Sequence, residues 1–536
     1  MIRLLQNHIV AKRLGHPDHN DVNPPTDYKN MIAKTVMIQG TGSSVGKSIL
    51  VTALCRIFKQ QGLKVAPFKA QNMSLNSFVT ADGGEIGRAQ VVQAEAAGIA
   101  PTVEMNPVLL KPASDQSAQI IVRGRPWTTI SAAHFPDLKT ELWGAITESI
   151  DQLRRAYDVI VIEGAGSPAE INLKDRDLVN MKVATYCNAP VLIAADIDRG
   201  GIFAALVGTM ELLEPAERAR VKAFIVNKFR GDVSLLTPGL HWLERRTGIP
   251  VAGVIPYFHD IQIAEEDSLA LEKRRALKNR TDFDLDIAVI ALPHIANFDD
   301  FDPLEGEPAV RLRYVEAGDH LGAPDLIILP GTKSTVADLG YLRDSGREKE
   351  VVAAVSAGIP IIGICGGYQM LGSVIHDPHQ IESKNRLTSG MRLLPAVTHF
   401  LAVKSTHQVK ARVSACFGLL AKAMDVTITG YEIHMGHSEE NSASRPFLIE
   451  QRSGKSCSDR DGSLSSDGNI VGTYIHGLFH NDAFRRAILD ELAERKGKTL
   501  TASPATFSAD EQYDRLAAHM RANLNMDLIQ RILDNQ

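Results

Sequence analysis

Short apolar runs recur along the chain, and most of them end in a glycine-rich or polar turn that leads into a helical stretch. A strand of a parallel sheet reads as a continuous apolar run because both of its faces are buried. Their alternation with helical stretches predicts an α/β protein with two doubly wound, mainly parallel-sheet domains. The predicted strands are 35–39, 63–68, 158–163, 190–195, 221–227 and 249–256 in the first half, and 285–294, 325–330, 359–362, 430–437 and 470–479 in the second.

The same pattern divides the 536 residues into domains. Residues 1–33 are polar, proline-rich and aperiodic, which predicts a disordered extension. The apolar runs predict a first domain over 34–270 and a second over 285–485, with the boundary in the charged segment 264–281. From residue 486 to 536 the apolar spacing is helical, so we expect a helical C-terminal tail.

Composition narrows the class of protein. Hydrophobic residues make up 44% and charged residues 23%, as in soluble globular proteins, and the net charge of −5 is dispersed. Neither nucleic acid nor a membrane is therefore an expected partner. The five cysteines lack CxxC spacing, which argues against disulfides or structural zinc and favours a reducing cytoplasm. No apolar run is long enough to span a membrane, and the N-terminus lacks a signal-peptide pattern.

The first predicted strand leads into GTGSSVGKS and then into a helical stretch, the context that a phosphate-binding loop requires. Backbone N–H groups of such a loop, including those at Gly42 and Gly46, cradle phosphate oxygens. Lys47 neutralises phosphate charge, and the Ser48 hydroxyl reaches Mg²⁺. Thr41 stands where the usual pattern has its first glycine. The alternative, a glycine-rich turn without a ligand, is disfavoured by the flanking strand and helix.

Acidic residues end two of the predicted strands. Glu163 follows an apolar run and is the candidate to hold Mg²⁺ or its water beside the phosphate loop; capping of the next turn is the alternative. Asp196 and Asp198 follow another run. Asp196 is a candidate for a second Mg²⁺ water and Asp198 for orienting a substrate, although simple turn formation explains them equally well.

The loop after the second strand reads KAQNMSLNS. Polar side chains at this position lie where open α/β sheets bind ligands, and an ordinary solvated loop is the alternative. We expect Lys69 to assist Lys47 at the phosphates. Gln71, Asn72 and Asn76 are the candidates for contact with the substrate.

In the second half, the run 359–362 meets a Gly-Ile-Cys-Gly-Gly turn that leads into a helix. Glycines on both sides of Cys365 permit the tight bend of a nucleophile elbow, which exposes the side chain beside backbone N–H groups. Backbone amides at Gly366 and at Gly331, in the turn after an earlier strand, are candidates for an oxyanion hole. A buried structural cysteine is the alternative.

The GxCxGxQ elbow, the upstream PGT turn and a downstream His resemble the class I, triad-type glutamine amidotransferase domain. The resemblance implies that Cys365 attacks the side-chain amide of glutamine and that His476 takes the thiol proton. In the family pattern an acid lies two residues after the His, but this chain has Leu478. Glu432, from the neighbouring strand, is a candidate third member, and a dyad is the alternative.

Seven strings in order, from about residue 34 to 486, resemble the cobyric acid synthase family. The first half is also similar to dethiobiotin synthetase, and both halves to cobyrinic acid a,c-diamide synthase, but the text Gln71–Asn72–Met73–Ser74 favours cobyric acid synthase. The strings are QGTGSSVGKS, KAQNMSLNS, EIGRAQ, MNPVLLKP, EGAGSPAEINL, DIDRGG and GYEIHMG.

This resemblance implies a glutamine-hydrolysing carbon–nitrogen ligase. It implies amidation of the b, d, e and g carboxylates of adenosylcobyrinic acid a,c-diamide, with ATP, Mg²⁺ and glutamine. Each carboxylate would be activated as an acyl phosphate and displaced by ammonia. A corrinoid needs a broad pocket, which is compatible with a homo-oligomer that shares its sites.

Two rival readings explain both halves. One is an amidotransferase of the CTP synthase type, with a nucleotide in place of the corrinoid. The other is an ATP-driven switch with an inactive amidotransferase domain, which is disfavoured because Cys365 and His476 are both present.

Overall fold

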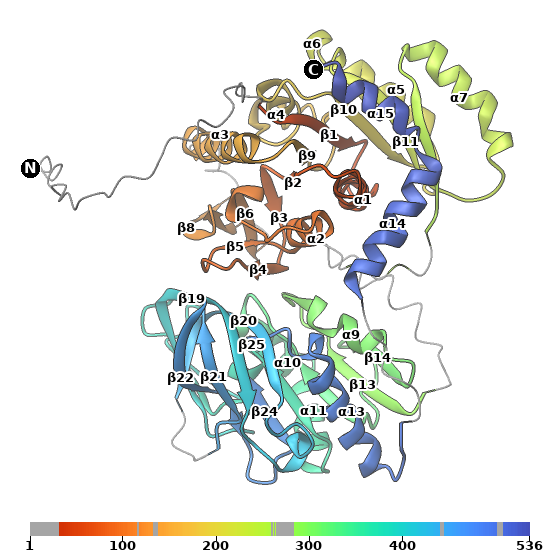
Figure 1. The fold of residues 1–536 in the computed structure, drawn as a ribbon. Coiled ribbons are helices and arrows are strands. Elements are labelled where there is room, and N and C mark those ends of the chain that lie inside the picture. The colour runs from red at the N-terminus through yellow and green to blue at the C-terminus, as the bar shows by residue number, and fades with distance from the viewer. Residues whose placement is uncertain are drawn as a thin grey trace, which may run out of the picture.

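The computed structural model describes residues 32–114, 117–131, 138–258, 261, 263, 283–439, 444–500 and 508–536. The extension expected over 1–33 lies almost entirely outside this part of the chain, and the boundary segment 264–281 lies wholly outside it. Two mainly parallel sheets organise the rest, one in each half (Figure 1). The predicted α/β class is therefore confirmed.

The first sheet has six parallel strands in the order β12-β11-β10-β1-β9-β2. In β1, Val36 and Ile38 belong to one hydrophobic core and Met37 to another, so apolar cores cover both faces. The strands are β1 Lys34–Gly40, β2 Val65–Phe68, β9 Val159–Glu163, β10 Val191–Asp196, β11 Val221–Phe229 and β12 Val251–Pro256.

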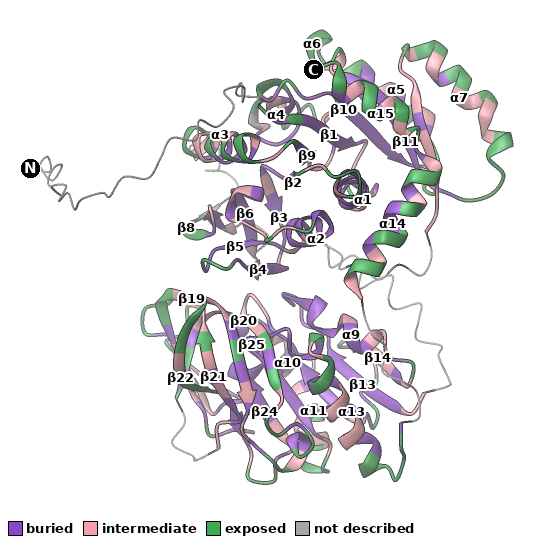
Figure 2. Ribbon diagram, viewed as in Figure 1, coloured by how far each residue is buried: buried purple, intermediate pink, exposed green. Residues whose placement is uncertain are grey.

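Helices supply the two cores. α1 (Lys47–Gln60) buries Leu50, Leu54 and Phe58 on one face of the sheet, whereas α3 and α5 contribute to the core on the other face. Figure 2 shows the buried strands between these helices. The remaining helices of this half are α2 Arg88–Ala97, η1 Val103–Met105, α3 Lys139–Ala156, η3 Lys174–Arg176, α4 Met181–Tyr186, α5 Ile202–Leu212, α6 Pro215–Arg218 and α7 Val233–Thr247.

An insertion between β2 and α3 extends the first domain towards the second (Figure 1). It forms a four-stranded sheet and a hairpin of β4 and β5, with α2 directly after the hairpin. Its strands are β3 Gln71–Met73, β4 Ser77–Val79, β5 Glu85–Gly87, β6 Val108–Ser114, β7 Ser117–Val122 and β8 Arg125–Ser131.

The main sheet of the second domain follows the order β14-β13-β15-β16-β24-β23, and its pairs are parallel except for β23 with β24. Its strands are β13 Leu285–Ile290, β14 Val310–Val315, β15 Leu326–Leu329, β16 Ile361–Ile364, β23 Ser463–Leu464 and β24 Ile470–Thr473. The helices are η5 Phe298–Phe301, α9 Asp302–Glu305, α10 Thr335–Asp344, α11 Arg347–Ser356, α12 Gly366–Leu371, η6 Gly418–Leu420, η7 Leu478–His480 and α13 Asp482–Arg495.

A seven-stranded, mostly antiparallel sheet lies beside it, which the sequence pattern does not predict. The run 470–479 is split between the two sheets, because β24 belongs to the parallel sheet and β25 pairs with β20. The strands of the antiparallel sheet are β17 Val374–His376, β18 Leu387–Ser389, β19 Val397–Val413, β20 Thr427–Glu439, β21 Phe447–Arg452, β22 Lys455–Asp461 and β25 Ile475–His476.

The C-terminal tail returns to the first domain (Figure 1). α14 (Ala509–Asn523) packs on α1, where Leu516 enters the same core as Leu50, and α15 (Met526–Asp534) lies against β1 and β12. The Arg56 guanidinium donates hydrogen bonds to Asp514 at 2.6 Å and Asp510 at 2.7 Å. Over 508–536 the tail forms these two helices, and it completes one core of the first domain. None of the described helices is long and apolar enough to cross a membrane.

We predict that Leu516→Ala lowers the free energy of unfolding by about 2–5 kcal/mol, because it leaves a cavity between the tail and α1. Leu235→Ala is the matched control: this leucine of α7 is 83% exposed, and its removal should change stability by less than about 0.5 kcal/mol. Denaturant unfolding measures both. Equal stability of the two variants would contradict a structural role for the tail.

Candidate active site

Cys365 lies at a sharp bend between β16 and α12. Its backbone has φ 51° and ψ −109°, a conformation that non-glycine residues rarely adopt. The bend also brings the backbone very close to neighbouring segments: a Cβ at Gly367 would lie 2.0 Å from the Leu329 carbonyl oxygen, and one at Gly363 would lie 2.5 Å from Leu371. The Gly-Ile-Cys-Gly-Gly sequence is therefore required for this geometry.

His476, on β25, lies close to the Cys365 thiol, whose Sγ donates a hydrogen bond to the Ile433 carbonyl oxygen at 3.6 Å. Its Nδ1 lies 2.7 Å from Oδ2 of Asp300 in η5, and the Gly477 N–H donates to the other carboxylate oxygen at 2.8 Å. Both His476 and Asp300 are buried. An ionised carboxylate only accepts hydrogen bonds, so Nδ1 carries the proton and Nε2 is directed to the thiol.

The electrostatics of this group favour a protonated imidazole. Burial lowers the pKa of His476, but Asp300 and Cys365 outweigh it and raise that pKa to about 10. A base with a raised pKa can hold the proton that it takes from a neighbouring thiol.

The assignment of Glu432 as the third member is corrected to Asp300. Tyr431, not Glu432, is the residue of β20 directly opposite His476, and its ring stacks on the imidazole with centroids 5.2 Å apart. Side chains alternate along a strand, so Glu432 points to the other face. There its two oxygens accept hydrogen bonds from Arg452 at 2.7 and 3.0 Å.

The sequence reading missed Asp300 because it is 176 positions from His476. The available signal is the acidic run NFDDFD after the first strand of the second domain. A polar cluster directly after a parallel strand marks the edge where ligands bind.

The two glycines predicted for the oxyanion hole lie next to these groups. A Cβ at Gly331 would be 2.9 Å from Cε1 of His476, and a Cβ at Gly366 would be 2.6 Å from the side chain of Thr332. The turn after β15 and the start of α12 therefore adjoin at Cys365 and His476.

In the first domain, the loop that we predict to bind phosphate lies between β1 and α1. Gly46 has φ 99° at the N-terminus of α1, and a Cβ there would lie 2.2 Å from Asn227. The Lys47 ammonium donates to the carbonyl oxygens of Gly42 at 2.8 Å and Gly166 at 3.1 Å. Its charge thus lies inside the loop, where phosphates of a nucleotide bind.

Glu163 lies across from this loop and is buried. Its carboxylate accepts hydrogen bonds from Ser48 at 2.8 Å, Lys69 at 2.9 Å and Gln93 at 2.5 Å. Burial raises the pKa of Glu163, but Lys69 and these hydrogen bonds outweigh it and hold the pKa below its usual value. The structure therefore brings three predicted residues together.

The oxygen donors Ser48 and Glu163 fit Mg²⁺, which uses one or two protein ligands and completes its shell with phosphates and water. Among the described residues no group of three or more His, Cys, Asp or Glu could hold a metal. Asp196 lies on the other side of β1, where Lys228 donates to it at 2.7 Å, and Asp198 pairs with Arg230 at 3.0 Å.

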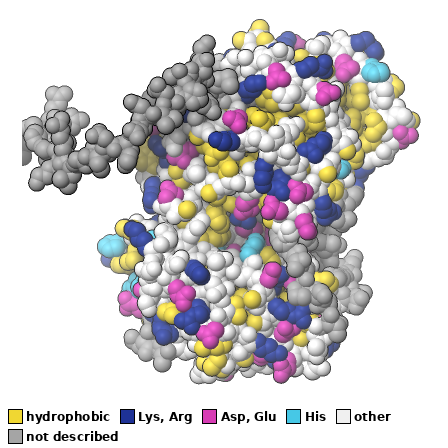
Figure 3. Space-filling model, viewed as in Figure 1, with side chains coloured by type: hydrophobic (Ala, Val, Ile, Leu, Met, Phe, Trp, Pro, Cys, Tyr) yellow, Lys and Arg dark blue, Asp and Glu magenta, His cyan; other side chains and the backbone are white. Residues whose placement is uncertain are grey.

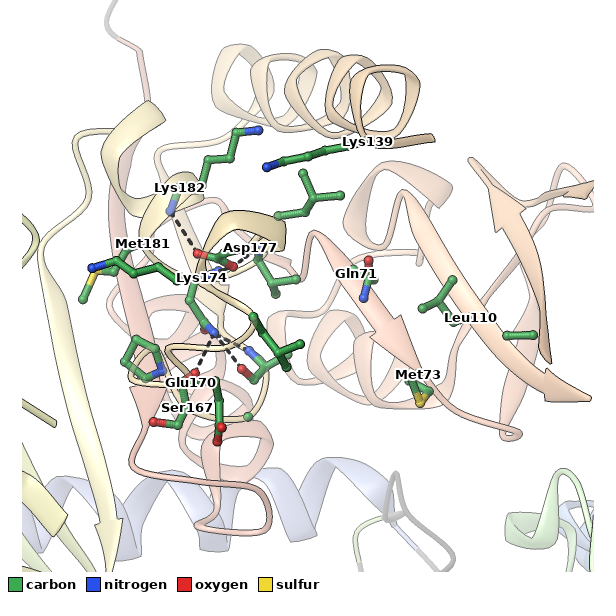
Figure 4. A pocket seen from close by; sticks show the side chains of 18 of the residues that line it. Gln71, Met73, Leu110, Lys139, Ser167, Glu170, Lys174, Asp177, Met181 and Lys182 are labelled. Carbon is green, nitrogen blue, oxygen red and sulfur yellow. Dashed lines mark hydrogen bonds between the residues drawn. The ribbon is translucent and has the colours of Figure 1, made fainter. Parts of the chain in front are cut away.

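A cavity of about 1430 Å³ opens beside the phosphate loop. Figure 4 shows Gln71, Met73 and Leu110 on its strand side, and Lys174 and Lys182 on the segment after β9. Pro293 and His294 of the second domain also line it. It combines apolar surface with both lysine and acidic side chains and lies between the two domains.

Of the four substrate candidates, only Gln71 lines this cavity. Asn72 donates to Gln90 at 3.1 Å, and Asn76 accepts from the Phe298 N–H of the second domain at 3.3 Å. Asp198 is also not among the lining residues. On the face in Figure 3, the described Lys and Arg side chains are interspersed with Asp and Glu.

Together, a phosphate-loop domain and an elbow cysteine with His and Asp define a glutamine-dependent ligase. Residues 36–271 match the CobQ/CobB/MinD/ParA nucleotide binding domain, and residues 286–484 match the CobB/CobQ-like glutamine amidotransferase domain.

Relatives narrow this class. The chain is 54% identical over 516 residues to the cobyric acid synthase of Sorangium cellulosum, covering 94% of this chain and 99% of that protein. It is 51% identical over 505 residues to that of Desulforamulus reducens, covering 94% and 98%, and 49% identical over 502 residues to that of Klebsiella pneumoniae, covering 93% and 98%. The chain belongs to the cobyric acid synthase family, and it is an enzyme.

We predict that Asp300→Asn lowers the kcat of glutamine hydrolysis by about 10²–10⁴, because an amide in place of the carboxylate favours the wrong tautomer of His476. Loss of the carboxylate also lowers the pKa of His476. Alkylation of Cys365 by iodoacetamide should therefore be slower than in the wild type at neutral pH, because a neutral imidazole no longer stabilises negative charge on the sulfur.

Glu432→Gln is the control, because that carboxylate faces Arg452. Its hydrolysis rate and alkylation profile should stay near those of the wild type. The assignment fails if Glu432→Gln is the more damaging change.

Proposed function

We propose that this enzyme amidates the b, d, e and g carboxylates of adenosylcobyrinic acid a,c-diamide in cobalamin biosynthesis. The observation that carries this proposal is the cavity of about 1430 Å³ beside the phosphate loop, whose size and mixed lining suit a large, partly apolar polycarboxylate. Lys139 and Lys182 line it and are the cations that we propose for the corrinoid carboxylates, whereas Lys174 is paired with Glu214 and Glu217. Gln71 also lines the cavity, and we propose that it contacts the substrate.

In the second domain, His476 takes the thiol proton and the Cys365 sulfur attacks the amide carbon of glutamine. The backbone amides at Gly331 and Gly366 stabilise the oxyanion that forms. His476 then protonates the leaving nitrogen, ammonia departs, and a thioester remains. Water hydrolyses the thioester to glutamate and regenerates the thiol, while Asp300 keeps the imidazole oriented.

In the first domain, an oxygen of the corrinoid carboxylate attacks the γ-phosphorus of ATP, and the bond to the leaving ADP breaks. Lys47 and Lys69 stabilise the transferring phosphoryl group. Ser48 and Glu163 would hold Mg²⁺, which would neutralise charge on the phosphates. Ammonia attacks the acyl phosphate at its carbonyl carbon, phosphate leaves, and the amide forms. Each round consumes one ATP and one glutamine.

Asp196 lies apart from Glu163, and we propose that it acts at most through a water of a second Mg²⁺.

The free cysteines support a reducing compartment such as the cytoplasm; they are Cys55, Cys187, Cys365, Cys416 and Cys457. A homo-oligomer stays a prediction.

We predict that Cys365→Ala loses glutamine-dependent amidation by about 10³-fold or more, since no other group forms the thioester. Amidation with added ammonia should stay close to the wild-type rate. Mass spectrometry of the corrinoid counts the amides in both assays. Retained glutamine-dependent amidation would contradict the role of this thiol.

We predict that Lys47→Ala lowers amidation by about 10²–10³-fold with either nitrogen source, because charge on the transferring phosphoryl is no longer neutralised. Lys222→Ala is the matched control, since this exposed lysine of β11 donates a hydrogen bond to the nearby Ala219 carbonyl oxygen at 2.7 Å. ADP release coupled to corrinoid amidation measures both. Unchanged ATP turnover in Lys47→Ala would overturn the phosphate-loop assignment.

A further inference from the structure

Residues 85–90 (EIGRAQ) take part in neither of the two proposed reactions, although they lie between the two reaction sites. They form β5 and the first turn of α2, where the insertion of the first domain meets the second domain. Arg88 and Asp299 form an ion pair across this interface, with Nε 3.1 Å from Oδ2. The carboxylate is 4% exposed, and among the described residues neither its buried Oδ1 nor Nε of Arg88 has a hydrogen-bond partner, so the two side chains interact through their charges. Arg88 is thus the main compensation for its charge.

Asp299 directly precedes Asp300, the acid that orients His476. The same turn is held from the first domain at two further points: the Ser77 N–H donates to the Asn297 side chain at 3.0 Å, and Asn76 accepts from the Phe298 N–H. Asn297 has φ 54°, so this tight turn is strained and depends on such contacts.

Aromatic contacts lead from the same side of the interface to His476. The Arg88 guanidinium lies 5.4 Å from the ring centroid of Phe78, and the ring centroids of Phe78 and Tyr431 are 5.1 Å apart. Tyr431 in turn stacks on His476. Arg88 therefore contacts both the turn that carries Asp300 and the ring stack behind the imidazole.

We propose that Arg88 is a positioning residue for glutamine hydrolysis, through which α2 of the ATP domain holds the Asp299–Asp300 turn and thereby His476. The same helix carries Gln93, which donates to Glu163 at the ATP site. One rigid element thus contacts both reaction centres. This inference rests on the proposed roles of Cys365, His476 and Asp300.

The pH dependence of glutamine hydrolysis distinguishes a positioning role of Arg88 from simple packing. Burial raises the pKa of Asp299, and Arg88 opposes that rise. Without Arg88 the pKa of Asp299 rises further. The Asp299 carboxyl group next to Asp300 then becomes negatively charged only as the pH increases. The groups that face Asp299 are Arg88 of α2, Asp300 and Asp302 on its own segment, His480 of η7 and Tyr431 of β20.

The test is the steady-state release of glutamate from glutamine by the full chain. Arg88→Gln should lower kcat by about 10–100-fold with little change in KM, because the imidazole is misplaced while glutamine binding is kept. The ratio of its kcat to that of the wild type should rise as the pH falls. Arg88→Lys should recover part of the rate, and Arg88→Gln with Asp299→Asn should recover the wild-type pH profile.

Gln408→Ala is the matched control, since Gln408 donates to the Val79 carbonyl of the same hairpin at 3.0 Å, away from Asp299. It should keep the wild-type kcat. A wild-type kcat and pH profile in Arg88→Gln would overturn the proposal, as would equal losses in Arg88→Gln and Gln408→Ala. Corrinoid amidation with added ammonia should persist in Arg88→Gln, and its absence in the wild type would refute the proposed function instead.

Discussion

A wholly buried carboxylate must be paired with a cation, and the buried Glu85 is paired with lysines from two different domains. Lys111 of the first domain contacts one of its oxygens and Lys404 of the second contacts the other. Burial raises the pKa of Glu85, but these lysines outweigh it and lower that pKa to about 2. Separation of the domains would remove one partner from this charge, so the interface has one strongly preferred arrangement.

That arrangement brings two ligand-binding edges together. In each domain the candidate site follows the carboxyl end of a parallel strand, β1 for the phosphate loop and β16 for Cys365. The cavity between them is lined by residues after β9 of the first domain and after β13 of the second. Residues of both domains therefore line one cavity.

The local sequence predicted those parts of the two sites that depend on residues close together in the chain or at the ends of neighbouring strands. Glycines around Cys365 and before Lys47 specify backbone conformations, and Ser48, Lys69 and Glu163 each end or follow a strand of one sheet, so their convergence was predictable. The partner of His476 was not, because η5 and β25 are distant in sequence and meet only through tertiary packing. The antiparallel sheet and the return of α14 to α1 likewise depend on long-range contacts that local periodicity does not encode.

The central claim is that Cys365 supplies the nitrogen that the ATP domain transfers to the corrinoid. The most direct test uses glutamine labelled with ¹⁵N in its amide, together with ATP, Mg²⁺ and cobyrinic acid a,c-diamide, followed by mass spectrometry of the product. The account predicts that the new amides made by the wild type carry the label and that Cys365→Ala makes no labelled amide. Labelled amides from Cys365→Ala, or a wild-type product without new amides, would contradict it.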